Sequence, residues 1–217
     1  MKKITPNLNY YGRYSDNFRK NAFQLIDWGY QDAIDKIRST IEKDQVEDDI
    51  TEAIANAIEN RLCTEEGPRW LNQYTIKNES PIKSKERTGK KRQRVDILIE
   101  STSQWRPQYL FEAKRLRKNG YGIGKYIDKK GMGCFITGAY GERYDEAAML
   151  GYVQSGTVAS WKKDIWDRID QDATNLDLNP PQKDFNTSSF NDVWLSNHDR
   201  SLVGRPIDIY HILLDCT

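Results

Sequence analysis

Apolar residues recur at helical spacing in two stretches near the start of the chain, residues 16–40 and residues 44–63. Side chains three and four positions apart lie on one face of a helix, so the pattern predicts two amphipathic helices. Gly29 is the weak point of the first helix, because glycine disfavours a helix interior. The first stripe consists of Phe18, Ala22, Phe23, Ile26, Ala33, Ile34 and Ile37, and the second of Ile50, Ile54, Ala57, Ile58 and Leu62.

Alternating apolar and polar residues predict strands at 70–78, 94–101 and 108–116, with a turn at 102–107 between the last two. Side chains of a strand point alternately to opposite faces, so the two faces of each strand can be read from the sequence. For residues 94–101, one face consists of Val95, Ile97 and Ile99, and the other of Asp96 and Leu98.

The second half of the chain mixes both patterns, and residues 146–154 fit either a helix or a strand. A polar loop that contains Pro180 and Pro181 is expected before the last strands. Helices that precede, separate and follow strands indicate an α/β or α+β domain with a mixed sheet flanked by helices. The remaining predicted elements are a short helix near 124–130, a strand at 133–138, a helix at 157–172 and strands at 192–200 and 207–216.

The composition is that of a globular protein, with 37% hydrophobic and 30% charged residues and a net charge of +1. The overall charge therefore indicates no class of partner, but its distribution is uneven. Residues 83–94 carry seven basic side chains against one acidic side chain. Such a block either attracts phosphate groups or forms a solvated hairpin loop, and the sequence alone favours neither.

Cysteine and histidine are too sparse for a zinc site. The three cysteines are far apart in the sequence, which indicates a reduced, cytoplasmic compartment. No apolar run approaches the length of a membrane span, so we expect no membrane association. His211 alternates with apolar residues and is expected in the core, whereas His198 is expected to be exposed and available to a phosphate or a partner.

The most informative residues are Asp96 on one predicted strand and Glu112 and Lys114 on the next. Leu110, Glu112 and Lys114 share a face, and if the two strands are neighbours, Asp96 joins them. Two carboxylates with few other ligands suit Mg²⁺ or Mn²⁺, and the backbone carbonyl of Ala113 adds a third oxygen. Lys114 then lies beside a metal-bound water, which it can orient or help to deprotonate. The competing interpretation is a cross-strand salt bridge on a solvated face, which the strand context makes the weaker one.

These residues resemble the motif of the PD-(D/E)XK nuclease superfamily, which has the restriction-endonuclease-like fold. The match consists of Val95 and Asp96 followed by Glu112, Ala113 and Lys114. Val95 stands where the motif has proline, and the helix after the motif shows no Gln-x-x-x-Tyr pattern. The resemblance covers residues 45–160 of a single domain, 1–217, and leaves a helical extension, 1–44, and a C-terminal part, 161–217, unexplained.

The resemblance implies a metal-dependent deoxyribonuclease with Asp96, Glu112 and the Ala113 carbonyl as metal ligands and Lys114 as the water-activating group. It also implies an accessory glutamate on the preceding helix. Glu52 is the first candidate for this role and Glu59 is the second. The alternative interpretation is that these glutamates belong to a solvated edge of the helix without a functional role. DNA is the expected substrate, and an RNase or a catalytically inactive DNA-binding or assembly subunit are the alternatives. Family analogy further implies a homodimer and an effector role in restriction or anti-phage defence with an ATPase or regulatory partner. Expected DNA contacts are Lys90, Lys91, Arg92, Arg94, Arg115, Arg117 and Lys118.

Overall fold

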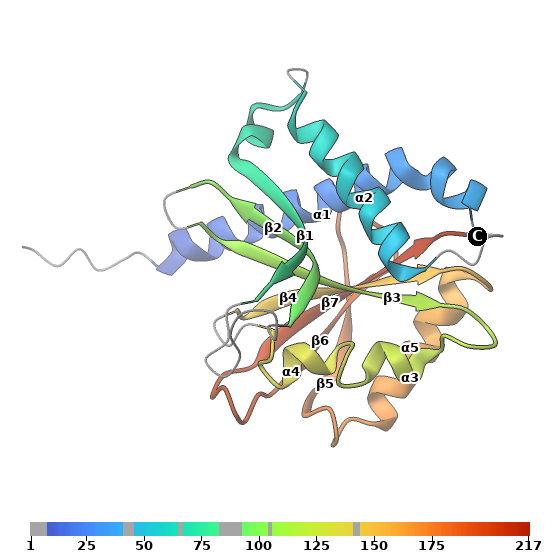
Figure 1. The fold of residues 1–217 in the computed structure, drawn as a ribbon. Helices are drawn as coiled ribbons and strands as arrows, with labels where there is room; N and C mark the ends of the chain where they lie inside the picture. Colours follow the sequence, from blue (N-terminus) through green and yellow to red (C-terminus); the bar gives the residue numbers. More distant parts are fainter. Residues whose placement is uncertain (1–7, 41–45, 65–66, 83–92, 104–105, 141–143) are drawn as a thin grey trace, which may run out of the picture.

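The chain folds into three layers, with one seven-stranded mixed sheet between two groups of helices (Figure 1). The computed structural model describes residues 8–40, 46–64, 67–82, 93–103, 106–140 and 144–217. The helices are α1 (Leu8–Thr40), α2 (Glu47–Leu62), the 3₁₀ helix η2 (Arg69–Gln73), α3 (Ile123–Ile127), α4 (Gly133–Ile136) and α5 (Val158–Gln171). The strands are β1 (Tyr74–Pro81), β2 (Arg94–Ser101), β3 (Gln108–Leu116), β4 (Glu146–Val153), β5 (Leu178–Phe185), β6 (Val193–His198) and β7 (Ile207–Asp215).

The strands lie in the order β1-β2-β3-β4-β7-β6-β5. β3, β4 and β7 are parallel in the middle of the sheet, and the outer strands pair antiparallel on both sides. The last strand of the chain therefore lies beside β4 at the centre, so residues 161–217 complete the sheet that residues 45–160 begin. The predicted α/β class with a mixed sheet and an N-terminal helix is confirmed.

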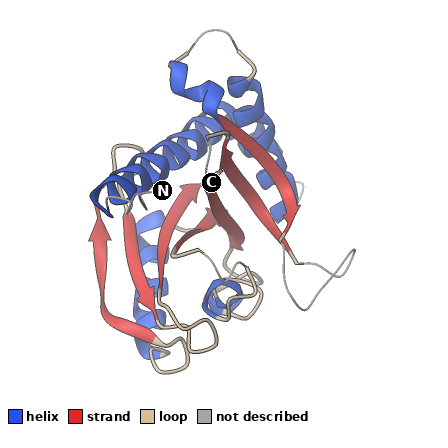
Figure 2. Ribbon diagram, turned by 90° about the vertical axis from the view of Figure 1, so that its left-hand side faces the viewer, coloured by secondary structure: helices blue, strands red, loops and turns tan. Residues whose placement is uncertain are grey.

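Helices α1 and α2 cover one face of the sheet, and α3, α4 and α5 cover the other (Figure 1). In Figure 2 the long helix α1 runs across the strands, and its buried residues share a core with β3, β4 and β7. Gly29 is the point where α1 meets α2. A Cβ atom there would lie 2.4 Å from Ile58 Cγ1 and 2.8 Å from the carbonyl oxygen of Ile54. The residue that weakens the helix in isolation is therefore the one that permits its packing. None of the helices in the described part of the chain is long and apolar enough to span a membrane.

The strands predicted at 94–101 and 108–116 are confirmed to the residue as β2 and β3. Residues 146–154, which fitted either pattern, form strand β4. The prediction for 70–78 holds only in part, because η2 precedes β1. Ile97 and Ile99 share the core on the α1–α2 side as predicted, but Val95 belongs to the core on the opposite side, together with Leu98.

Two predicted segments are wrong. Residues 133–138 contain the short helix α4 instead of a strand, because the chain folds back there onto α3. The amide of Met132 donates to the carbonyl of Tyr126, and the amide of Gly133 donates to that of Asp128. The loop expected around Pro180 and Pro181 is the edge strand β5, whose register is irregular at this point. An edge strand tolerates prolines because one of its sides forms no ladder of hydrogen bonds.

The prediction that His198 is exposed is also wrong. His198 and His211 are both fully buried and belong to one chain of hydrogen bonds between β6 and β7. The Oγ atom of Ser196 lies 2.7 Å from His198 Nε2 and 2.8 Å from His211 Nε2. Tyr126 of α3 contacts the other ring nitrogen of His211 at 3.1 Å. His211 is thus a core residue, as expected, and no histidine of the chain is available to a ligand.

Candidate active site

The candidate site forms where β2 and β3 separate. Their pairing ends at Ile97 and Phe111, so the next part of β3 has no neighbouring strand on this side. Two carboxylates take the place of that strand. Asp96 Oδ2 accepts a hydrogen bond from the amide of Ala113 at 2.6 Å, and Glu47 Oε2 accepts one from the amide of Arg115 at 2.9 Å. The open strand edge therefore brings acidic groups of β2 and α2 onto β3.

Lys114 lies at the centre of this group. Its Nζ atom is 2.8 Å from Glu112 Oε1, 3.0 Å from Glu47 Oε1 and 2.5 Å from the carbonyl oxygen of Ala113. The side chains of Lys114 and Glu112 are only 13% and 4% exposed. This pair is therefore not the solvated salt bridge that was the competing interpretation of the sequence. Asp96, Glu112 and Lys114 converge, and the carbonyl of Ala113 is part of the same group.

Glu47 is the site residue that the sequence analysis missed. It lies in the first turn of α2, where Glu47, Asp48 and Asp49 suit the positive end of the helix dipole. The acidic first turn was visible in the sequence, but the sequence does not say which of its members faces the sheet. Glu52 and Glu59, the predicted candidates, are both exposed on α2. Glu52 lies about 7 Å further along the helix axis than Glu47, and no described contact joins it to Lys114.

Glu52 instead lines an open pocket of about 390 Å³ that adjoins Asp96. The pocket lies between α2, the end of β1 and the start of β2. Among its described lining residues Arg94 is the one cation, and it is paired with Glu79 at 3.0 Å, so carboxylates outnumber basic groups in this part of the lining. It is lined by Asp48, Thr51, Glu52, Asn78, Glu79, Arg94 and Asp96.

Burial perturbs the ionisation of the site. Burial raises the pKa of Asp96 to about 6, although the Lys114 charge opposes this. Burial, and then the charge of Asp96, raises the pKa of Glu112 well above its usual range. Burial alone would lower the pKa of Lys114, but Glu112, Glu47 and Asp96 outweigh it, and the pKa lies above its ordinary value. Lys114 is consequently a firmly held cation, and its neighbours Asp96 and Glu112 resist full ionisation.

The wall of the site on the α3–α4 side consists of Cys134 and Tyr140. The Tyr140 hydroxyl donates to the carbonyl of Arg94 at 2.6 Å and so ties this wall to the start of β2. Burial, and then the charge of Glu112, raises the pKa of the Cys134 thiol to about 12, so the thiol stays protonated. Because residues 133–138 fold as a helix and not a strand, Cys134 is placed close enough to Glu112 to sense its charge.

The chemistry of the donors fits a hard divalent cation. Glu112 Oε2 is buried and accepts no hydrogen bond from the described residues, and Glu112 Oε1, Glu47 Oε1 and the Ala113 carbonyl surround the Lys114 ammonium. Carboxylate and carbonyl oxygens are the ligands that Mg²⁺ and Mn²⁺ prefer. Within the described ranges, no three acidic, imidazole or thiol groups are grouped as metal ligands. The Lys114 ammonium occupies the position between Glu47, Glu112 and the Ala113 carbonyl, so a cation that binds there has to displace it.

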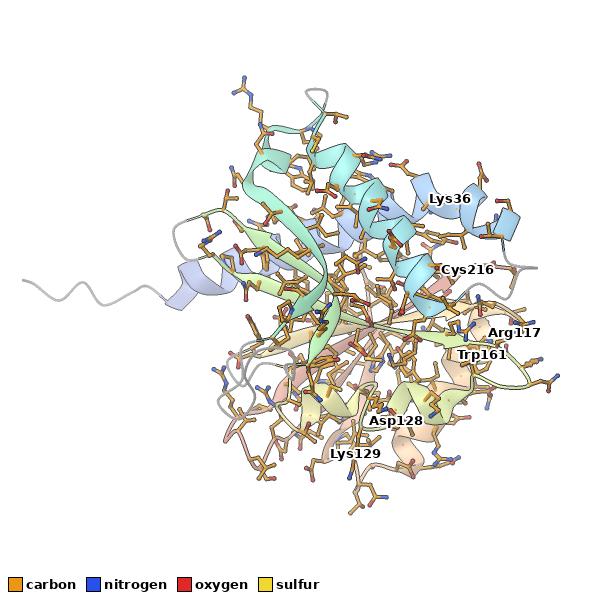
Figure 3. All side chains as sticks on the ribbon, in the orientation of Figure 1. Lys36, Arg117, Asp128, Lys129, Trp161 and Cys216 are labelled. Carbon is orange, nitrogen blue, oxygen red and sulfur yellow. The ribbon has the colours of Figure 1, made fainter. Side chains whose placement is uncertain are left out.

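The predicted DNA contacts divide into three groups. Lys90, Lys91 and Arg92 lie outside the described residues. Arg94 is exposed beside the pocket, whereas Arg115 is only 6% exposed and packs beneath Tyr121. Arg117 and Lys118 lie in the hairpin that follows β3, and Figure 3 shows Arg117 beyond the end of that strand.

The comparisons with known proteins give no relative from which a family can be assigned: no family model, curated protein or solved structure matches the chain.

Proposed function

We propose that this chain is a nuclease that uses Mg²⁺ or Mn²⁺ to hydrolyse phosphodiester bonds of DNA, with a site of the PD-(D/E)XK kind. The observation that supports the proposal is the convergence of Asp96, Glu112 and Lys114 at the separation of β2 and β3. The restriction-endonuclease-like identity of the fold is part of the proposal. A mixed sheet between two helical layers, with the acidic groups at one open strand edge, is consistent with it.

In this proposal Asp96, Glu112, Glu47 and the Ala113 carbonyl hold the metal ion. The ion supplies a Lewis acid and an activated water for attack on phosphorus. The high pKa of Lys114 favours its charged form, so its role is to donate hydrogen bonds to the attacking water or to a phosphate oxygen. The protonated Cys134 and Tyr140 exclude bulk water from the side of Glu112 without adding charge.

The test is cleavage of supercoiled plasmid DNA with Mg²⁺ or Mn²⁺ by the wild type and by Asp96→Asn, Lys114→Ala and Glu47→Gln. We expect each substitution to lower the rate at least about 100-fold, because each removes a group that acts on the transition state. Glu59→Gln is the matched control for Glu47→Gln, since it makes the same change on an exposed position of α2. A second readout is the melting temperature, which Mg²⁺ should raise in the wild type and not in Glu47→Gln. Wild-type rates in Asp96→Asn and Lys114→Ala would contradict the proposal.

A catalytically inactive DNA-binding or assembly subunit is the second candidate. The observation in its favour is the Lys114 ammonium, which forms ion pairs with both Glu47 and Glu112 and so occupies the position between them. This alternative predicts DNA binding that persists in EDTA and no cleavage with either metal at any ratio of protein to DNA. Parallel reactions with RNA separate a ribonuclease from both.

A further inference from the structure

An exposed aromatic ring borders the candidate active site. Among the described ranges, three large hydrophobic side chains are exposed: Val46, Tyr121 and Leu202. Val46 immediately precedes Glu47, and Tyr121 packs on Arg115, the residue after Lys114. Two of the three thus lie at the place where α2 meets β3, and the 41% exposure of Tyr121 leaves much of its ring open to solvent.

The Tyr121 ring is held in a fixed position. Arg117 donates its amide hydrogen to the Tyr121 carbonyl at 2.9 Å, and the reverse hydrogen bond measures 3.3 Å. The hairpin is also tied to the segment after β4, because the Lys118 amide donates to Ser155 Oγ at 2.8 Å. Beneath the ring, the Arg115 guanidinium carbon lies 3.7 Å from the ring centroid. A ring that is already immobilised loses little conformational entropy when a ligand stacks on it.

Both residues next to Tyr121 in the chain, Gly120 and Gly122, are glycines. A Cβ atom added at Gly120 or at Gly122 would meet no other atom within 4 Å. Larger residues at these two positions would restrict access to Tyr121. The combination of a supported inner face and unobstructed flanks is the geometry of a stacking surface, because a planar ligand needs room to lie flat.

Short contacts connect this ring to the proposed cleavage centre. The guanidinium under Tyr121 belongs to Arg115, whose amide donates to Glu47 Oε2. The other oxygen of Glu47 contacts Lys114 Nζ at 3.0 Å. Lys114 and Arg115 are consecutive on β3, so their side chains leave opposite faces of the strand, and the Glu47 carboxylate at the strand edge contacts both residues. A nucleic acid that crosses this edge can therefore place a phosphate beside Lys114 and a base on Tyr121.

We infer that Tyr121, supported by Arg115, is a stacking platform for an unpaired nucleobase next to the cleaved phosphodiester. The inference rests on the proposed function and narrows its substrate to strands with at least one unpaired base, such as a single strand or an overhang. Every nucleobase has a π-face, so such a platform is tolerant of sequence. In an intact duplex the base faces are covered by their neighbours and do not reach the ring.

The test compares cleavage of a single-stranded oligonucleotide and of its duplex by the wild type, Tyr121→Phe, Tyr121→Ala and the control Leu202→Ala. Stacking of one base on an aromatic side chain predicts that Tyr121→Ala lowers kcat/KM on the single strand about 10-fold. Tyr121→Phe keeps the π-face and the rate, and Leu202→Ala, which changes an exposed apolar residue elsewhere, has no effect. Circular dichroism melting verifies folding, and Tyr121→Leu, which keeps Arg115 covered without a π-face, should behave as Tyr121→Ala.

Abasic substitutions make the test specific. For the wild type, removal of the base at one substrate position adjacent to the cut should lower kcat/KM about as much as Tyr121→Ala does. The Tyr121→Ala variant should cleave this abasic substrate and the intact substrate at the same rate. Equal cleavage of the single strand by the wild type and Tyr121→Ala would overturn the stacking platform and leave the nuclease proposal intact. The stacking platform would also be overturned if the wild type cleaves intact duplex faster than the single strand and is insensitive to an abasic site at every position of the substrate. A wild type that cleaves no nucleic acid with Mg²⁺ or Mn²⁺ would overturn both.

Discussion

The sheet carries two buried clusters of polar side chains, and they differ in how completely their hydrogen-bonding atoms have partners. The first is the chain from Tyr126 through His211 and Ser196 to His198. The second is the acidic group around Lys114. In the first group each donor meets an acceptor, whereas in the second the buried Oε2 atom of Glu112 accepts a hydrogen bond from none of the described residues.

The hydrogen bonds of the histidine chain fix the position of each proton. His198 Nδ1 contacts the carbonyl of Leu176 at 2.7 Å, and because a carbonyl only accepts, this nitrogen carries the hydrogen. His198 Nε2 therefore accepts from the Ser196 hydroxyl, and that hydroxyl oxygen accepts from His211 Nε2. His211 Nδ1 then accepts from Tyr126. Both rings are neutral, in agreement with burial, which lowers the pKa of each.

The acidic group is the reverse case. Asp96, Glu112 and Glu47 carry three carboxylates against the single ammonium of Lys114. A protein selected only for stability satisfies its buried polar groups, because an unpartnered one costs free energy. The comparison teaches that a fully partnered network is a structural element, whereas an excess of buried like charge indicates a position for a ligand.

The largest effect should come from removing the one cation of the acidic group. Lys114→Met leaves Glu112 buried without its partner, and we expect a loss of about 3–5 kcal/mol in the free energy of unfolding at pH 7. The loss should shrink at lower pH as Glu112 becomes protonated. Urea unfolding at several pH values measures both effects. In the double variant Glu112→Gln/Lys114→Met most of the stability should return, and a double variant no more stable than Lys114→Met would contradict the charge argument.

A smaller loss is expected in the histidine chain. Ser196→Ala leaves a nitrogen of each ring without a partner and should cost about 2 kcal/mol. Ser101→Ala, at another buried strand serine, is the control and should cost less. The comparison of the two regions fails if Ser196→Ala is silent in urea unfolding, or if it abolishes Mg²⁺-dependent cleavage while the protein remains folded.

The smallest predicted effect is a gain in the free energy of unfolding, caused by the substitution Asp96→Asn. The pKa of Asp96 is about 6 in the folded chain against a usual 3.8, so the folded state holds this proton more tightly than the unfolded state. The ionised carboxylate therefore costs stability above pH 6, and the cost disappears as the pH falls through 6 toward 4. We expect Asp96→Asn to raise the free energy of unfolding at pH 8 by about 1–2 kcal/mol.

The melting temperatures of Asp96→Asn and of the exposed control Asp48→Asn at pH 8 and pH 5 measure this effect. The gain should be largest at pH 8 and about half as large at pH 5, because pH 5 lies midway between the folded and unfolded pKa values of Asp96. The two neutral histidines act in the opposite direction, since a lowered histidine pKa removes stability as the pH falls below 6.5. A gain in Asp96→Asn that grows toward pH 5 would show that burial of the charge is not its cause.

The sequence predicted the parts of the site that depend on periodicity within one strand. Asp96, Glu112 and Lys114 could be placed together because strand side chains alternate and the two strands are consecutive. Glu47 could not, because its contact depends on how α2 is rotated against the sheet, which tertiary packing decides. The same limit explains His198, which was predicted to be exposed, because the residues that bury it come from another strand and from the loop before β5.

Local propensity misled where close backbone packing decides the structure. Residues 133–138 contain a strand-like apolar run, but the chain at Gly131 and Gly133 is pressed against carbonyl groups of α3. Prolines argue against a strand in the interior of a sheet, but an edge strand tolerates them. The sequence could not show that β5 is an edge strand, because the order of the strands depends on the whole topology.

The crossing of α1 and α2 at Gly29 has a consequence for the candidate site. Gly29 has only a hydrogen atom as its side chain at the point where α1 packs on α2, so even one added methyl group would push the two helices apart. Glu47 lies on the same helix, about two to three turns before the residues of α2 that Gly29 contacts, Ile54 and Ile58. A substitution at the crossing in α1 is therefore expected to shift Glu47, although Gly29 itself makes no contact with the residues of the candidate site described above.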